Sequence, residues 1–131
     1  MNPAPVRPRI PDYGRHLLVC VGERCTEDGM TPAELNNVVR KLTAAGLLQP
    51  GALRVKPSRV NCLGACGSGP VMCVHPDGVW YFDVQPPHLD RIIDEHLVGG
   101  RVVEEFVFHR GPRSRDGIPQ PARDDGDAQA A

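Results

Sequence analysis

The sequence predicts a single domain of the α/β class, built on a mixed β-sheet with helices packed against it. Two patterns lead to this prediction. Short apolar segments bounded by glycine or proline are typical of strands, and they alternate with two longer segments whose apolar residues recur at helical spacing. Hydrophobic residues make up 40% of the 131-residue chain, which is enough for one modest core.

Two segments predict strands in the first half of the chain. Residues 16–21 form a short apolar run that ends at Gly22, as a buried strand does. Residues 53–60 alternate weakly between apolar and polar side chains and predict a second strand and its continuation, with Pro57 between the two parts.

A helix is predicted between these two strands. Thr31 is a suitable N-cap, Pro32 fits the first helical position, and Glu34 completes a capping box. Gly46 follows the helix at the place where a left-handed residue commonly ends one. The helix carries one apolar stripe, which requires a sheet to pack on: Leu35, Val38, Val39, Leu42 and Ala45.

A β-hairpin and a second helix complete the predicted order. Two apolar segments, 70–75 and 79–84, flank a tight turn at 76–78. Pro86-Pro87 opens the second helix and Gly99-Gly100 ends it. The order β-α-β, then β-hairpin, then α is typical of the thioredoxin-like architecture.

The two ends of the chain differ from its centre. Residues 1–14 hold four prolines and predict a flexible Pro-rich arm. Residues 110–131 are rich in Gly, Pro, Asp and Arg and predict a disordered tail, because they cannot bury enough apolar surface. The domain is therefore expected over 15–109, where 102–108 add an extended segment that seals a core edge or a subunit contact.

Charge and hydropathy exclude several classes of function. The 15 Lys+Arg and 16 Asp+Glu give a net charge of −1, which supplies no electrostatic case for nucleic acid or an anionic membrane. No apolar run approaches the roughly 18 residues of a membrane span, and the first nine residues lack the apolar core of a secretory signal. We therefore expect a cytoplasmic protein, whose five cysteines serve metal binding or redox chemistry rather than disulfides.

Four of the cysteines form two closely spaced pairs. Four residues separate Cys20 from Cys25, and three separate Cys62 from Cys66. If strands 16–21 and 70–75 are neighbours, all four thiols meet at one end of the sheet. Four thiolates at one point suit either a tetrahedral zinc ion or an iron–sulfur cluster.

The loop around the second pair favours the iron–sulfur cluster. Its three glycines, Gly64, Gly67 and Gly69, let backbone N–H groups turn toward cluster sulfur, where each bond stabilises added negative charge. Leu63 and Ala65 would shield such a cluster from water. Zinc needs no glycine-lined pocket, and this cysteine spacing is not the usual zinc spacing. Buried or free thiols are the remaining alternative.

The other candidate residues are left out of the site. Cys73 lies in the middle of a predicted strand, which favours a small core or face residue over a fifth ligand. His88 and His96 are eight residues apart on a helix, and a site there is not needed beside four cysteines. The sequence has no nucleotide-binding, nucleophile or C-x-x-C motif, so we predict an electron-transfer protein with no catalytic residues rather than an enzyme.

Several segments closely resemble the bacterial thioredoxin-like [2Fe-2S] ferredoxins. The resemblance extends from about His16 to Arg110, and its specific parts are Cys62-Leu63-Gly64-Ala65-Cys66, Gly69-Pro70-Val71 and Val74 to Tyr81. It implies a one-electron carrier with redox proteins as donor and acceptor, and a homodimer in at least some members. It also implies that four cysteines hold one [2Fe-2S] cluster: Cys20, Cys25, Cys62 and Cys66.

The short spacing of the first pair also resembles the related [2Fe-2S] domain of a small subunit of complex I and of some hydrogenases. Those subunits carry an N-terminal helical extension, whereas this chain has a short Pro-rich arm, which favours the stand-alone type. Two alternatives stay open: a redox subunit of a larger flavin-dependent oxidoreductase or hydrogenase, and a cluster- or zinc-based sensor or structural module. The partner-facing surface is expected near the cluster loops, at Glu23, Arg24, Glu27 and Asp28.

Overall fold

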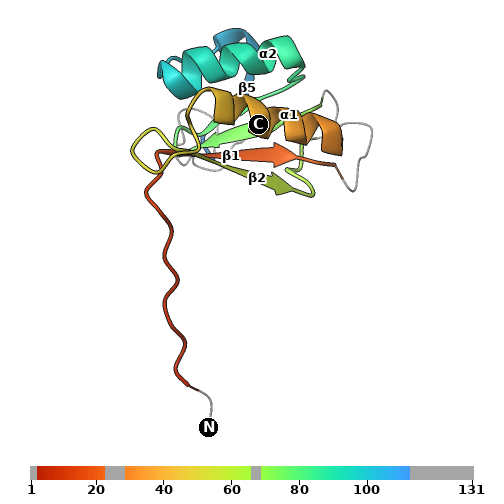
Figure 1. The fold of residues 1–131 in the computed structure, drawn as a ribbon. Coiled ribbons are helices and arrows are strands. Elements are labelled where there is room, and N and C mark those ends of the chain that lie inside the picture. The colour runs from red at the N-terminus through yellow and green to blue at the C-terminus, as the bar shows by residue number, and fades with distance from the viewer. Residues whose placement is uncertain (1–2, 23–28, 66–68, 113–131) are drawn as a thin grey trace, which may run out of the picture.

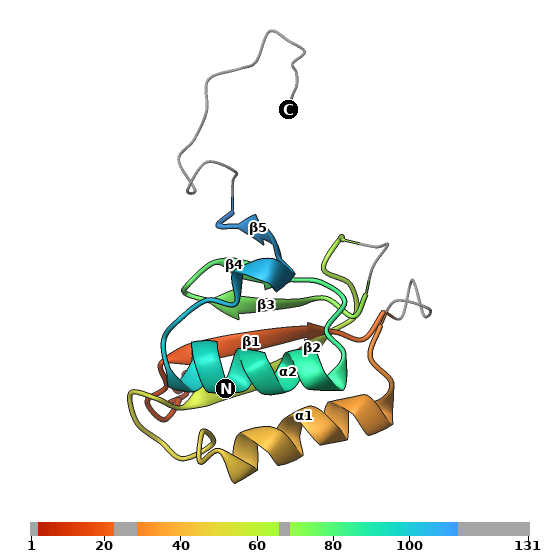
Figure 2. The same ribbon diagram turned by 90° about the horizontal axis from the view of Figure 1, so that it is seen from above.

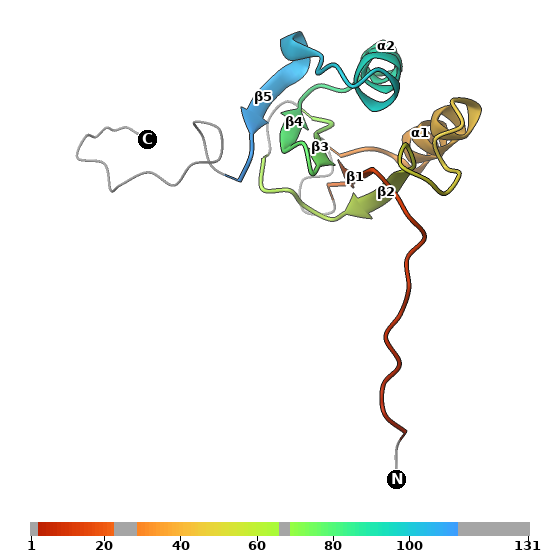
Figure 3. The ribbon, with the colours of Figure 1, turned by 90° about the vertical axis from the view of Figure 1, so that its left-hand side faces the viewer.

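The computed structural model describes residues 3–22, 29–65 and 69–112. In these residues a five-stranded sheet has the order β2-β1-β3-β4-β5, with β1 and β2 parallel and the other neighbours antiparallel. The strands are β1 (Arg15–Cys20), β2 (Val55–Val60), β3 (Met72–His75), β4 (Val79–Tyr81) and β5 (Val107–Arg110). Helices α1 (Pro32–Ala44) and α2 (Pro86–Arg91) pack on one face of the sheet (Figures 1 and 3). The predicted α/β mixed sheet is confirmed.

Helix α1 begins and ends as predicted. The backbone N–H of Thr31 donates to Glu34 Oε1 at 2.8 Å, and the N–H of Glu34 donates to Thr31 Oγ1 at 3.2 Å, which is a complete capping box. Gly46 follows the helix with φ +73°, and its N–H donates to the Thr43 carbonyl. Val39, which belongs to the predicted apolar stripe, is 44% exposed.

Strand β2 is one continuous strand rather than two parts separated by Pro57. It lies at the edge of the sheet. The carbonyls of Arg54 and Val60 accept hydrogen bonds from residues of or next to β1, so alternate residues pair with β1. Pro57 falls on the other alternation, and its missing N–H therefore lies on the outer edge, where it costs no ladder bond.

The second half of the domain differs more from the sequence-based expectation. Strand β4 ends at Tyr81, because Asp83 turns the chain with a φ of 50°. The second helix continues as a π-helical segment over Ile92–Val98, although its apolar residues are buried as expected. The extended segment predicted near the end becomes a short 3-10 turn, Glu104–Phe106, followed by β5.

The core lies between the sheet and the two helices. Figure 2 shows α1 and α2 alongside one another, and an ion pair between Lys41 and Asp90 joins them. The described residues contain no helix long and apolar enough to cross a membrane. The most deeply buried core side chains are Leu17, Val19, Val38, Leu42, Val55, Met72, Val74, Tyr81, Leu89, Ile92 and Leu97.

Three aromatic side chains cluster away from the helices, near β4 and β5. Trp80 follows the core residue Val79 and precedes the core residue Tyr81, so it lies on the opposite face of the sheet. The Trp80 and Phe82 rings both meet Phe108 edge-to-face, with centroids 6.2 Å and 6.1 Å apart. Phe108 remains 42% exposed, so part of this aromatic cluster faces solvent.

The chain before β1 leads away from the body of the domain (Figure 1). Val6 is 88% exposed in this segment, and Ile10 is 60% exposed. The arm joins the body where the Gly14 N–H donates to the Arg54 carbonyl at 2.8 Å. Most of the predicted tail, residues 113–131, lies outside the described residues.

A buried polar network joins the β3–β4 turn to the π-helical segment. Tyr81 Oη accepts a hydrogen bond from the Val103 N–H at 3.1 Å and lies 2.7 Å from His96 Nδ1, to which it can donate. His96 Nε2, in a side chain that is 0% exposed, lies 2.7 Å from Asp77 Oδ2. Asp77 also forms an ion pair with Arg15 at 3.1 Å. The network thus ties β1, the turn and the helix together at the end of the sheet opposite Cys20.

The charge on Asp77 follows from this network. Burial on its own would raise the pKa of Asp77, but hydrogen bonds from His96 and Arg15 outweigh that effect and lower it. A carboxyl whose pKa is lower in the folded state stabilises the fold above its unfolded pKa of about 3.9. That stability is lost as the pH falls through the folded-state pKa.

We expect Asp77→Asn to lower the free energy of unfolding at pH 7 by about 1–3 kcal/mol, because the hydrogen bonds to a charged acceptor are lost. Wild-type stability should fall as the pH drops from about 5 to about 2, because Asp77 is protonated in this range. The variant lacks this carboxyl and should lose less stability over the same range. Urea denaturation across this range measures both effects. Asp90→Asn is the matched control, since that exposed ion pair should contribute at most about 1 kcal/mol. Equal losses in the two variants would contradict the role of the network.

Candidate metal centre

Cys20 and Cys62 lie at the same end of the sheet. Cys20 is the last residue of β1, and the parallel register places it opposite Val60, the last residue of β2. The Val21 N–H donates to the Val60 carbonyl at 2.9 Å, so the two strands are still joined at their ends. Cys62 follows two residues later. Parallel pairing alone therefore brings the first cysteine of each predicted pair to one place.

Strand β3 starts at this same end. It runs antiparallel to β1, with Met72 opposite Val19, and the Cys20 N–H donates to the Val71 carbonyl at 3.1 Å. The condition set by the sequence, that the first strand and the strand after the second cysteine pair are neighbours, is therefore confirmed. The loop between β2 and β3 must leave and return at the thiol end of the sheet.

The loop after Cys62 directs a backbone N–H at the sulfur. The Gly64 N–H donates to Cys62 Sγ at 3.2 Å. Gly64 has φ +74°, and a Cβ there would meet no atom within 4 Å. Glycine is thus required by the left-handed backbone rather than by lack of space. A backbone N–H that donates to a cysteine sulfur in this way is a feature of sites where that sulfur binds a metal group.

The two described thiols differ in their environment. Cys20 is half-buried, whereas Cys62 is exposed. The chain on the β3 side of the loop is better covered, because Pro70 and Val71 are buried and the Val84 N–H donates to the Pro70 carbonyl at 3.0 Å. A group held by both thiols would therefore have a protein wall on one side and solvent near Cys62.

The second cysteine of each pair, Cys25 and Cys66, lies outside the described residues, as do Glu23, Arg24, Glu27 and Asp28. Next to this segment, the Met30 N–H donates to the Cys20 carbonyl at 3.0 Å. In residues 3–22, 29–65 and 69–112, no three His, Cys, Asp or Glu side chains are arranged to hold a metal ion. Those ranges contain only two of the four predicted ligands.

The residues left out of the predicted site have other environments. Cys73 is 6% exposed in the middle of β3, and burial raises the pKa of its thiol to about 11, so it stays protonated at neutral pH. His88 Nδ1 lies 2.6 Å from the Asp83 carbonyl oxygen, to which it can donate, while His96 belongs to the Tyr81–Asp77 network. The two histidines therefore have separate hydrogen-bond partners.

Sequence reasoning missed the Tyr81–Asp77 network, because its members are scattered in sequence.

The donor chemistry at the thiol end suits a sulfur-ligated metal group. Thiolates are the ligands of zinc and of iron–sulfur clusters, and a thiolate that accepts a backbone N–H is typical of iron–sulfur sites. The one oriented polar group near Cys62 among the described residues is the Gly64 N–H.

Comparison with known proteins gives related sequences, although no family model matches the chain. A putative 2Fe-2S ferredoxin of Priestia megaterium is 31% identical over 94 residues, which are 72% of this chain and 69% of that protein. A 2Fe-2S ferredoxin of Aquifex aeolicus (strain VF5) is 50% identical over 51 residues, 39% of this chain and 46% of that protein. A 2Fe-2S ferredoxin of Clostridium pasteurianum is 36% identical over 52 residues, 40% and 51% of the two chains. The last two matches therefore span about half of each relative.

Solved structures extend the similarity over most of the chain. A thioredoxin-like [2Fe-2S] ferredoxin from Aquifex aeolicus aligns with a TM-score of 0.59 and 31% identity, covering 82% of this chain and 98% of that one. A crystal structure of the wild-type thioredoxin-like [2Fe-2S] ferredoxin from the same organism gives a TM-score of 0.55 and 30% identity, covering 76% of this chain and 99% of that one. The predicted thioredoxin-like fold is confirmed. By the extent and identity of these matches, the chain belongs to the family of thioredoxin-like [2Fe-2S] ferredoxins.

Proposed function

We propose that this protein is a one-electron carrier with one [2Fe-2S] cluster, held by Cys20, Cys25, Cys62 and Cys66. The observation that carries the proposal is the strand register, which brings Cys20 and Cys62 to one end of the sheet. The Gly64 N–H that donates to Cys62 Sγ supports a cluster in preference to a simple thiol pair. Family membership supports the same cofactor and role.

The protein would bind the cluster, shield it from water and shift its reduction potential. A bound [2Fe-2S] cluster supplies reversible one-electron chemistry. The Gly64 N–H stabilises negative charge on the Cys62 sulfur and thereby favours the reduced state. Pro70 and Val71 exclude water from one side, while Cys62 is exposed and gives the electron a short path to a partner. No bond in a substrate is made or broken, so no side chain needs to move a proton.

The cluster assignment has a direct test in the cysteine variants. Anaerobically purified protein should be red-brown, with about two iron and two sulfide per chain. Cys62→Ala should lose most of the visible absorption and iron, whereas Cys73→Ala should keep both, because Cys73 is a buried, protonated core residue. A colourless wild-type protein with one zinc per chain would instead make the cysteines a structural site.

The role of the Gly64 N–H is testable by comparing two glycines with nearly the same backbone. Gly64 and Gly46 have φ of +74° and +73°, and neither position is crowded. An alanine at either should cost about 1–2 kcal/mol of stability from left-handed strain. Only Gly64→Ala should also shift the reduction potential to more negative values, because it disturbs the N–H···S bond. Protein-film voltammetry measures the potential, and equal potentials in both variants would contradict this role.

We propose that the protein is a homodimer, and that the aromatic cluster of Trp80, Phe82 and Phe108 contributes to the contact between copies. The family resemblance supports a dimer, and the exposed edge of Phe108 supports this location. Aromatic residues are enriched in the centres of protein interfaces, where they bury large apolar areas.

This location predicts that Phe108→Asp shifts the protein from dimer to monomer in light-scattering measurements at micromolar concentration. The reason is that a carboxylate would be buried without a partner in the contact. Leu53→Asp, at a 60% exposed apolar residue far from β5 in the sheet order, is the control and should leave the mass unchanged. A wild-type monomer at all concentrations would refute the dimer, and an unshifted Phe108→Asp dimer would refute its location.

A further inference from the structure

We propose that the groove between α1 and β2 docks the redox partner of this protein, and that the partner presents an apolar group beside a carboxylate there. This inference rests on the proposed electron-carrier function and adds to it a surface and a partner chemistry. It concerns the described part of the chain and is separate from the surface expected at residues 23–28.

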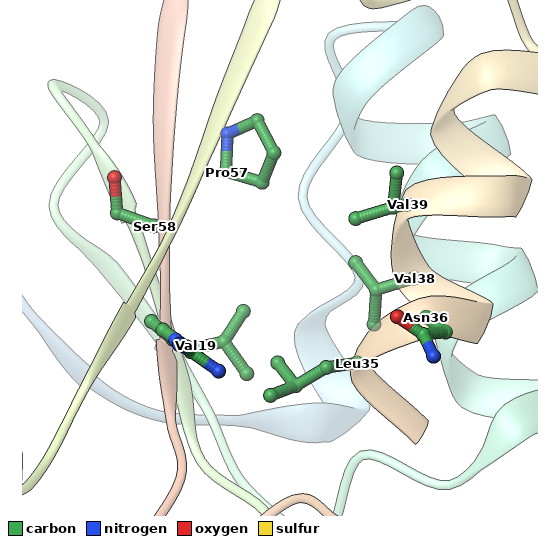
Figure 4. A pocket seen from close by; sticks show the side chains of 8 residues that line it. Val19, Leu35, Asn36, Val38, Val39, Pro57 and Ser58 are labelled. Carbon is green, nitrogen blue, oxygen red and sulfur yellow. The ribbon is translucent and has the colours of Figure 1, made fainter. Parts of the chain in front are cut away.

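The groove has an apolar floor and two apolar walls (Figure 4). Val19 of β1 and Val38 of α1, each 1% exposed, form the floor. Pro57 of β2 and Val39 of α1 point into the groove from opposite sides, and Val39 is 44% exposed. The cavity has a volume of about 230 Å³ and is lined by Val19, Leu35, Asn36, Val38, Val39, Pro57, Ser58 and Arg59.

The charge carried by the residues that line the groove is positive. Arg59 is the only charged residue among those that line it, and it is exposed. In the described part of the chain, Arg59 forms no ion pair. A guanidinium beside an apolar surface is well suited to a bidentate hydrogen bond with a carboxylate. Charge complementarity therefore selects an acidic partner.

The size of the groove fits an apolar group on the surface of another protein rather than a free small molecule. Its volume is below the roughly 300–1,000 Å³ of sites that hold small-molecule ligands. Pro57 lies on the outer edge of β2 and supplies no N–H there, so a partner strand cannot extend the sheet across this position. The contact that remains is apolar packing against Val39 and Pro57, together with a carboxylate at Arg59.

The groove lies next to the thiol end of the sheet. Val19 precedes Cys20, and Arg59 stands opposite Val19 in the strand register. Arg59 and Cys62 are three residues apart, so their Cα atoms are separated by at most about 11 Å. Electron-transfer rates fall steeply with distance, and a partner seated in this groove would therefore have a short path from the thiols.

The test is stopped-flow oxidation of the reduced, full-length protein by two probe proteins at low salt. One probe is a flavodoxin, an acidic FMN protein, whose oxidised FMN takes one electron from the reduced protein and one proton from solvent to become the semiquinone. The other is cytochrome c, a basic protein whose ferric haem takes one electron. Arg59→Glu should slow the flavodoxin reaction about five- to tenfold and accelerate the cytochrome c reaction, since charge reversal acts mainly on the association rate.

Matched variants separate docking from general charge effects. Arg101→Glu makes the same charge change at an exposed residue that follows the π-helical segment. This segment lies at the far end of β1, where Arg15 donates to the Leu97 carbonyl. Arg101→Glu should therefore change either rate less than about twofold, as expected of a remote charge. Val39→Asn should slow both probes about threefold, because apolar contact is lost without a change in charge. The effect of Arg59→Glu should disappear near 1 M salt, where the Debye length is about 3 Å.

The visible spectrum of each variant, recorded before mixing, separates the two proposals. A colourless wild-type protein overturns the electron-carrier function and the docking surface with it. A fully coloured protein whose rates respond equally to Arg59→Glu and Arg101→Glu overturns the docking surface alone. Rates that respond to Arg59→Glu but not to Val39→Asn overturn the groove and leave only a charged patch.

Discussion

The structure depends on the two-sided pairing of β1. This strand pairs in parallel with β2 and antiparallel with β3, so its last residue, Cys20, lies beside the end of one neighbour and the start of the other. The chain that connects β2 to β3 must therefore pass by Cys20, and it is this connection that carries Cys62. A register shift of one residue in either ladder would turn the core residues Leu17 and Val19 away from the helices. The same packing that forms the core thus fixes the position of the thiols.

The two ends of the sheet differ in the interactions that they carry. At one end, the network of Arg15, Asp77, His96 and Tyr81 joins β1, β4, the β3–β4 turn and the π-helical segment. At the other end, among the described residues, the backbone N–H of Gly64 donates to Cys62 Sγ, and the left-handed backbone of this glycine sets the local conformation. The side-chain network and the described thiols therefore lie at opposite ends of β1.

The parts of the fold that local chemistry determines could be predicted from the sequence. The capping box of Thr31 and Glu34 fixed the start of α1, and the clustered turn residues 76–78 located the hairpin. The π-helical segment and the pairing of β5 could not be predicted, because both result from packing between residues distant in sequence. At the site, the first cysteine of each pair could be placed because Cys20 ends a recognisable strand and Cys62 follows another. The Tyr81–His96–Asp77 network has no sequence pattern, since its members come from a strand, a helix and a turn.

The proline in β2 has a consequence for how long encounters last. An open sheet edge is a template on which another backbone can form several hydrogen bonds at once, and complexes made in this way separate slowly. Pro57 interrupts that template at the edge next to the thiols. Contacts along this edge must then rely on a few side chains, whose bonds break quickly and independently. A protein that has to release one partner before it meets the next gains from such short residence times.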